Sequence, residues 1–532
     1  MELIPNIQFR HPDFYPIVGE DYKGFLRGYF YHDHQCITHE NFANLYPKAD
    51  FQASDFENWN GEFALVIQRN EEVVLVTDKK RSIPLFYSQS KNQQWLIQDF
   101  VEQSSNTKLQ EDAVEEFLIT GFVAGSKTMF QEWSQVEAAS YVTLGSTAKQ
   151  AFYYSFVVEK ETKELSEWTS ELASIFNDIF DDLAKRLEGK QIIIPLSGGY
   201  DSRLISIMLC ERGLKDQITT FTYGRPGNGE STVSKQIADR LGLRWKYFEY
   251  NKELWSNMYQ SKEWEEYVQY SSNGVSVAHL QDFPSTQKLT KEENLKNAVF
   301  IPGHSLDYLA GGHLPHEAVF GKNFTQDEVI QFILNKHHRL WTPVNGLWAG
   351  APTTIQGIRD YVSKFDDYSN ENVCNIIDEW NWRERQSKFI INSVRIYEFF
   401  GQDWTLPLWD DRLIYFFSNI PVEWKYKKYL YDLTVHEMFP DFYDKPTKPS
   451  PEVSLRSKYG PLYPVLRKIY RKRNLLKQYY TEPMEWFGIY PTYQQYVRSL
   501  SIKMSGQKYK DPYNVNSFIV KDMIQKMRET TK

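Results

Sequence analysis

The segment with the clearest chemical signature runs from Leu196 to Ser202 and reads LSGGYDS. Adjacent glycines let a backbone approach an anion closely, and the free N–H groups at the start of a helix bind negative oxygens. Hydroxyl groups at Ser197 and Ser202 add hydrogen-bond donors. Asp201 would repel phosphate unless it holds a magnesium ion that bridges to the phosphate oxygens. The segment therefore predicts a phosphate site with a metal ligand; the alternative is a glycine turn with a Ser/Asp helix cap.

The elements around this loop favour the phosphate site. A buried-type strand, Gln191–Leu196, precedes the loop, and a helix, Asp201–Cys210, follows it. A long amphipathic helix begins at Trp168, ahead of both. The later segments are the strand Ile218–Tyr223, the helix Ser231–Leu241 and the strands Arg244–Glu249 and Ala298–Pro302. This alternation predicts a doubly wound parallel sheet, in which ligands bind outside the carboxyl ends of the strands.

The N-terminal part of the chain has a different pattern. Its short β-rich runs, helix-type segment and closing strand are Gly61–Ile67, Val73–Thr77, Ile83–Tyr87, Asp112–Thr120 and Tyr141–Leu144. The polar stretch Val158–Ser166 is typical of a linker. We therefore predict an α/β protein with a β-rich domain of hairpins at residues 1–157 and a parallel-sheet domain at residues 166–532.

The order of the motifs resembles that of the glutamine-dependent asparagine synthetases and their relatives, which include β-lactam synthetases and lasso-peptide cyclases. The loop at 196–202 resembles that of the ATP pyrophosphatases, which cleave ATP between the α- and β-phosphates; the Walker loop is absent. The other matching segments are Gly61–Ala64, Thr77–Asp78, Pro84–Tyr87, Phe221–Gly224, Pro302–Gly312, Arg385 with Leu406–Arg412, and Lys427–Tyr431. The resemblance implies a degenerate glutaminase domain, built as an Ntn-hydrolase-like β-sandwich, followed by an ATP pyrophosphatase domain.

By the same resemblance, ATP and Mg²⁺ are the expected cofactors. Asp201 and Asp307 would be the magnesium ligands. Lys428 would neutralise charge on the α-phosphate, with Lys425 and Lys427 as alternatives. The ATP-binding residues would be Leu196, Ser197, Gly198, Gly199, Asp201, Ser202, Tyr223 and Gly303.

Three positions depart from the family pattern. The chain starts with Met1-Glu2, where glutamine-hydrolysing members have a cysteine after the initiator methionine. Ammonia, a substrate amine or a separate glutaminase is therefore expected to supply the nitrogen. His304 stands in the position of the general-base glutamate, and Tyr308 replaces the second acid of that motif. Imidazole can act as a base near neutral pH, so His304 is the predicted catalytic base; the alternative is a hydrogen-bond donor to pyrophosphate.

Composition limits the class of protein. The formal net charge of -8 over 532 residues lacks the basic excess of a dedicated nucleic-acid binder. No apolar run approaches the length of a membrane span, and the three cysteines form neither a disulfide framework nor a metal-site spacing, so a cytoplasmic location is expected. The basic, apolar-interleaved segment Leu462–Arg473 could contact a membrane surface or an anionic glycan-lipid. A surface helix with its apolar stripe inward is the reading we favour.

These features predict an ATP-dependent, asparagine synthetase-like amide-forming ligase. It would activate a carboxylate as acyl-AMP, release pyrophosphate, and pass the acyl group to an amine. The sequence does not identify the acid: aspartate, a uronic acid of a surface polysaccharide and a peptide carboxylate are all compatible with it. The alternative from another class is a catalytically silent relative that binds nucleotide and acts as a scaffold. The retained carboxylates Asp201 and Asp307 disfavour it, because a binding module has little need of a metal-holding aspartate.

Overall fold

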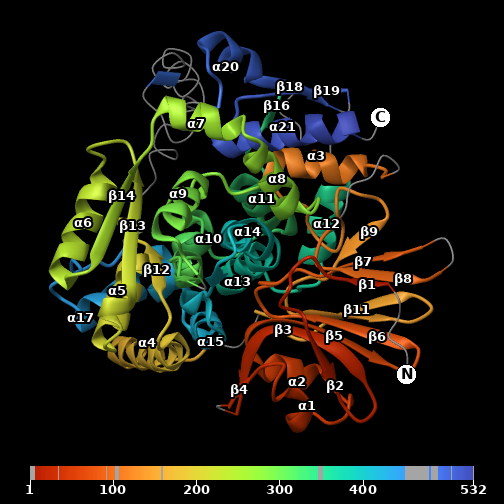
Figure 1. Ribbon diagram of the computed structural model, residues 1–532, viewed down its shortest axis with the longest axis horizontal. Helices are drawn as coiled ribbons and strands as arrows, with labels where there is room; N and C mark the ends of the chain where they lie inside the picture. The colour runs from red at the N-terminus through yellow and green to blue at the C-terminus, as the bar shows by residue number, and fades with distance from the viewer. Residues whose placement is uncertain are drawn as a thin grey trace.

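The computed structural model describes residues 6–33, 35–90, 93–101, 107–156, 160–296, 298–344, 352–449, 479–480, 489–504 and 506–530. Within these ranges the chain is a mixed α/β protein with four sheets (Figure 1). The predicted basic segment Leu462–Arg473 lies outside the described residues, as do residues 158 and 159 of the predicted linker. None of the described helices is both long and apolar enough to cross a membrane.

Two sheets occupy the N-terminal part. The larger is antiparallel, in the order β11 (Ala148–Phe152), β10 (Ser140–Leu144), β6 (Glu72–Thr77), β5 (Asn60–Arg69), β3 (Lys23–His32) and β2 (Tyr15–Val18), with β4 (Gln35–Ile37) paired to β3. The smaller runs in the order β1 (Ile7–Gln8), β8 (Trp95–Gln98), β7 (Phe86–Gln89) and β9 (Trp133–Gln135). Apolar residues of both sheets, such as Val66, Leu75, Tyr87 and Ile97, share one buried cluster. The two sheets therefore pack face to face, as expected for the β-sandwich that the resemblance implied.

The central sheet is parallel throughout, in the order β14 (Arg244–Glu249), β13 (Ile218–Gly224), β12 (Ile192–Pro195), β15 (Val299–Phe300) and β17 (Asp403–Trp404). The chain runs from β12 outward to β14 and then returns to β15 on the other side of β12. The strand order therefore reverses between β12 and β15, and the carboxyl ends of these neighbouring strands frame a crevice where ligands bind in such sheets. Figure 1 shows α6 on one side of this sheet and α9 on the other.

The helix that precedes the central sheet in the chain has the features that its sequence predicts. The long helix α4 (Leu165–Leu187) begins with a capping box between Glu164 and Glu167 and buries its apolar stripe. The other described helices are α1 (Phe42–Leu45), α2 (Ala53–Asn58), α3 (Glu111–Thr120), α5 (Tyr200–Glu211), α6 (Gly229–Leu241), α7 (Lys252–Tyr259), α8 (Lys262–Ser272), α9 (Phe283–Glu293), α10 (His316–Phe320), α11 (Gln326–His337), α12 (Pro352–Val362), α13 (Asn370–Trp380), α14 (Arg395–Phe399), α15 (Asp411–Asn419), α16 (Val422–Lys425), α17 (Tyr429–Met438), α20 (Tyr493–Ser499) and α21 (Val515–Thr530). A small antiparallel sheet, which the sequence did not predict, joins β16 (Thr342–Pro343), β19 (Gln507–Lys510) and β18 (Ser501–Met504).

One predicted strand begins later than expected. The run Ile83–Tyr87 was predicted as a strand, but β7 starts only at Phe86. The buried carboxylate of Asp78 accepts hydrogen bonds from the backbone N–H groups of Lys80 and Ser82, at 2.7 and 3.3 Å, and holds the preceding residues in a loop. Pro84 has no N–H to give to a sheet ladder, so the apolar residues here are buried without being strand.

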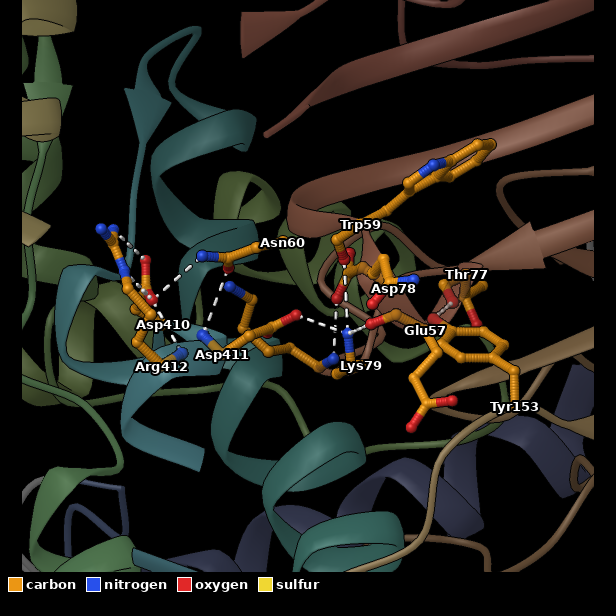
Figure 2. Close-up of polar contacts among 12 residues, drawn as sticks. Glu57, Trp59, Asn60, Thr77, Asp78, Lys79, Tyr153, Asp410, Asp411 and Arg412 are labelled. Atoms are coloured by element: carbon orange, nitrogen blue, oxygen red, sulfur yellow. Dashed lines mark hydrogen bonds and ion pairs between the residues drawn. The ribbon is translucent and has the colours of Figure 1, made fainter. Parts of the chain in front are cut away.

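Buried ion pairs join the N-terminal sheets to the rest of the molecule. Lys79 follows β6, and its Nζ lies 2.7 Å from Oδ2 of Asp411, the first residue of α15. Figure 2 shows the ammonium group pointing at this carboxylate and at the backbone of Glu57 and Trp59. A second pair joins Arg27 of β3 to Glu398 of α14. These contacts hold the two halves of the chain in a defined arrangement.

Candidate active site

A cleft of about 500 Å³ opens at the carboxyl ends of β12, β13 and β15, where the strand order reverses. Most of the residues predicted from the sequence line it: Leu196, Ser197, Gly199, Asp201, Ser202, Tyr223, Gly303, His304, Asp307 and Lys428. The exception is Gly198, which lies on the same loop and packs against α6, where a Cβ would come within 3.5 Å of the Cα of Glu230. The structure therefore brings together residues that lie more than 200 positions apart.

The loop between β12 and α5 is preformed by its own hydroxyl groups. The backbone N–H of Ser197 donates to Oγ of Ser202 at 3.1 Å, and the N–H of Gly199 donates to Oγ of Ser197 at 3.1 Å. The carbonyl of Gly198 accepts a hydrogen bond from Arg203 at 3.0 Å. Helix α5 begins directly after the loop, so its N-terminal end faces the cleft. This arrangement suits an anion such as a polyphosphate.

Two carboxylates, those of Asp201 and Asp307, line the crevice. Burial, followed by the negative charge of Asp307, raises the pKa of Asp201 to about 7. Burial would also raise the pKa of Asp307, but the hydrogen bond and charge of His313, with Lys428, hold this pKa near 2. The hydroxyl of Tyr431 donates to Oδ1 of Asp201 at 2.9 Å and fixes the carboxylate. The negative charge of Asp307 disfavours ionisation of Asp201, and a divalent cation between them would remove this repulsion.

The donor set fits magnesium better than a metal held by protein alone. Among the described residues, no group of three or more His, Cys, Asp or Glu side chains is placed to hold a metal ion. Mg²⁺ usually takes one or two carboxylates and completes its shell with water and substrate phosphates. Asp201 and Asp307 supply that number of carboxylates next to the phosphate-type loop.

Gly303 allows the two loops of the crevice to meet. A Cβ at this position would lie 2.8 Å from the backbone nitrogen of Ser202 and 3.1 Å from the Cβ of Asp201. Any side chain would therefore push the loop after β15 away from the loop after β12. This close approach is what places Asp307 opposite Asp201.

The structure separates the three candidate lysines. Lys425 is buried, and its Nζ forms an ion pair with Asp378 at 2.6 Å. Lys427 is exposed, and does not line the cleft. Lys428 lines the cleft, with Nζ 3.4 Å from Oδ1 of Asp432. Both Lys427 and Lys428 have positive φ values, 52° and 63°, a costly conformation for non-glycine residues that the surrounding packing imposes.

His304 is held by a hydrogen bond at one ring nitrogen. Its Nε2 lies 2.7 Å from Oγ of Ser393, and this hydroxyl also donates to the carbonyl of Ile390 at 2.8 Å. A hydroxyl has one proton, so with Ile390 as its acceptor it must accept from Nε2–H of His304. The Nδ1 atom then carries the lone pair. Burial lowers the pKa of His304 to about 4, so the ring is neutral at neutral pH.

Several cleft residues were not assigned from the sequence. They are His279, Gln281, Asp282, Ser305, His313, Gln386 and Arg385, the last of which the resemblance used only as a landmark. Burial lowers the pKa of Arg385 to about 10, and no described carboxylate lies within ion-pair distance of it. A partly desolvated guanidinium in a cleft suits an anionic ligand. These residues lie in loops and irregular helical turns, which lack a periodic signal that could have marked them.

Comparison with known proteins establishes neither a family nor a fold for this chain. No family model and no curated protein matches the chain. Among solved structures, an NH3-dependent NAD synthetase from Campylobacter jejuni is 16% identical, with a TM-score of 0.20, over 39% of this chain and 99% of that one. A structure described as the allosteric regulatory enzyme of purine biosynthesis is 10% identical, with a TM-score of 0.19, over 56% of this chain and 72% of that one. TM-scores this low establish no shared fold, so the function of this chain is inferred from its own residues.

Proposed function

We propose that this protein is an ATP-dependent, AMP-forming amide ligase of the asparagine synthetase type. One observation carries the proposal: Asp201, Asp307 and Lys428 converge on a Ser-Gly-Gly-x-Asp-Ser loop where the order of a parallel sheet reverses. Three charged groups of this kind are not needed to stabilise a turn. They suit the cleavage of a polyphosphate, in which charge develops on the transferred group and on the leaving group.

In the first half-reaction a substrate carboxylate oxygen attacks the α-phosphorus of ATP, and pyrophosphate leaves. The loop from Ser197 to Ser202 would bind the pyrophosphate through N–H and hydroxyl donors. Asp201 and Asp307 would hold magnesium, which supplies charge neutralisation at the phosphates. Lys428 would bring positive charge to the α-phosphate, and Tyr223, at the end of β13, would contact the nucleotide.

In the second half-reaction an amine nitrogen attacks the acyl carbon, AMP leaves and one proton is released. The neutral His304 would accept this proton at Nδ1, because its Nε2 is already hydrogen-bonded to Oγ of Ser393. The amine would come from ammonia, from a second substrate or from a separate glutaminase. Cys36, the described cysteine of the N-terminal sheets, is no substitute for a glutaminase thiol, because burial raises its pKa.

The decisive experiment is exchange of labelled pyrophosphate into ATP in the presence of magnesium and candidate acids: aspartate, uronic acids and peptides with free carboxylates. The expected result is acid-dependent exchange and release of AMP. Asp201→Asn should abolish exchange, while Asp239→Asn, an exposed carboxylate of α6 paired with Lys235, should leave it intact. ADP as the main product would refute the proposal. ATP binding without exchange for any acid would instead favour the silent scaffold.

A further inference from the structure

A second imidazole, that of His279, lines the cleft and has no part in the proposed half-reactions. Its Nε2 lies 3.6 Å from Oδ1 of Asp282, and 28% of its side chain is exposed. Asp282 itself is only 5% exposed. The hydroxyls of Tyr223 and Tyr397 both donate to the Asp282 carboxylate, the second at 3.1 Å. A buried carboxylate thus stands directly behind a histidine that faces the cleft.

Asp282 is a fixed negative charge. Burial alone would raise its pKa, but the nearby N–H and charge of His279 and the hydrogen bond of Tyr223 lower the pKa to about 2. A carboxylate behind an imidazole fixes both the ring orientation and the proton position, because the negative charge favours the N–H that faces it. For His279 that nitrogen is Nε2. In the neutral ring the lone pair then lies on Nδ1, which is the ring atom left for a ligand.

Rigid elements hold this pair in place. Asp282 immediately precedes α9, and its carbonyl accepts the N–H of Thr286 at 2.9 Å. Tyr223 belongs to the end of β13, and Tyr397 belongs to α14. Three separate elements therefore fix Asp282, and through it His279. A side chain held in this way can bind one group of a ligand in a defined orientation.

We propose that His279, oriented by Asp282, is a specificity-determining residue whose Nδ1 accepts a hydrogen bond from a hydroxyl or amino group of the carboxylate substrate. This inference rests on the proposed function and narrows its substrate class. The acid carries a hydrogen-bond donor, as sugar acids and amino acids do, and is not a plain aliphatic acid. A site built to accept such a bond discriminates against analogues without the donor, because a ligand that covers the ring nitrogen without bonding to it leaves that nitrogen unpaired.

Pyrophosphate exchange with two matched pairs of acids tests the inference. One pair is L-aspartate and succinate, which lacks the amino group. The other is D-glucuronate and tetrahydropyran-2-carboxylate, which lacks the hydroxyl groups. Wild-type protein should prefer the donor-bearing member of one pair by at least about 10-fold, and the pair that shows the preference distinguishes an amino acid from a sugar acid.

His279→Ala should remove this preference and leave the KM for ATP unchanged. His279→Asn keeps an amide oxygen as acceptor and should restore part of the preference, while Asp282→Asn, which is nearly isosteric, should weaken it. His39→Ala, which changes an imidazole stacked on Tyr15 in the N-terminal part, is the matched control and should change nothing.

An unchanged preference in His279→Ala, or an equal loss of exchange with both members of a pair, would overturn the inference. Exchange without any preference in the wild type would overturn it too and leave the proposed function standing. Exchange with none of the four acids and with no peptide carboxylate would count against the proposed function itself, and the inference would fall with it.

Discussion

Replacing Lys79 with methionine should lower the free energy of unfolding by about 3–5 kcal/mol. The Lys79 side chain is 1% exposed and its partner Asp411 is 5% exposed. The ammonium group contacts Oδ2 of Asp411 at 2.7 Å, the carbonyl of Glu57 at 2.6 Å and the carbonyl of Trp59 at 3.4 Å. Methionine fills similar space, so the loss is electrostatic: one buried carboxylate and two carbonyls lose their donor.

Little else stabilises the buried negative charge of the Asp411 carboxylate. Its Oδ1 has no hydrogen-bond partner among the described residues, so the contact with Lys79 is the main stabilisation of a buried charge. Removing both charges should therefore cost less than removing Lys79 alone. We expect the double variant Lys79→Met, Asp411→Leu to be more stable than the single variant by about 2 kcal/mol, within the usual range of coupling between contacting residues.

Urea unfolding followed by circular dichroism measures these differences across the wild type, the two single variants and the double variant. Lys190→Met is the matched control: its ion pair with Asp403 is 3.9 Å long, with side chains 48% and 55% exposed, and its loss should cost less than about 1 kcal/mol. A loss below about 1 kcal/mol in Lys79→Met, or additive effects in the double variant, would refute the reasoning.

Four further outcomes are expected. Lys428→Met should slow pyrophosphate exchange by about 10²–10³-fold, and Lys427→Met should leave it unchanged, because only the first of these side chains lines the cleft. Equal effects would refute the assignment. Gly303→Ala should reduce exchange without unfolding the protein, since its Cβ would meet the backbone of the phosphate-type loop; wild-type exchange in a folded variant would contradict this. No glutamate should be released from glutamine, as an enzyme-coupled glutamate assay would show; steady release lost in Cys36→Ser would show the opposite. Arg27 and Arg395 overcome the effect of burial and lower the pKa of Glu398 from 4.5 to about 2. This stabilisation is present above pH 4.5 and should be lost as the pH falls toward 2, a dependence that Glu398→Gln should flatten in urea titrations.

The sequence was sufficient where the signal is local. The apolar strand before the loop, the helix after it and most of the elements that follow lie close to the predicted bounds, and β14 matches them at both ends. The predicted strand Ala298–Pro302 is shorter, because β15 spans only Val299–Phe300. Such patterns are readable because burial repeats with the period of each element. The phosphate-type loop was readable for the same reason, since two glycines and a polar helix start follow directly after a buried strand. Asp307 and Lys428 were reached only through the order of later motifs.

Only the tertiary structure decided the features that depend on distant partners. The choice among three adjacent lysines turned on Asp378, which takes Lys425 out of the cleft. The arrangement of His279 and Asp282 depends on Tyr397, which lies 115 positions farther along the chain than Asp282. The pair between Lys79 and Asp411 spans 332 positions. The tertiary fold determines which residues surround a charged group, and therefore whether that group is buried, paired or free. A local sequence pattern does not contain this information.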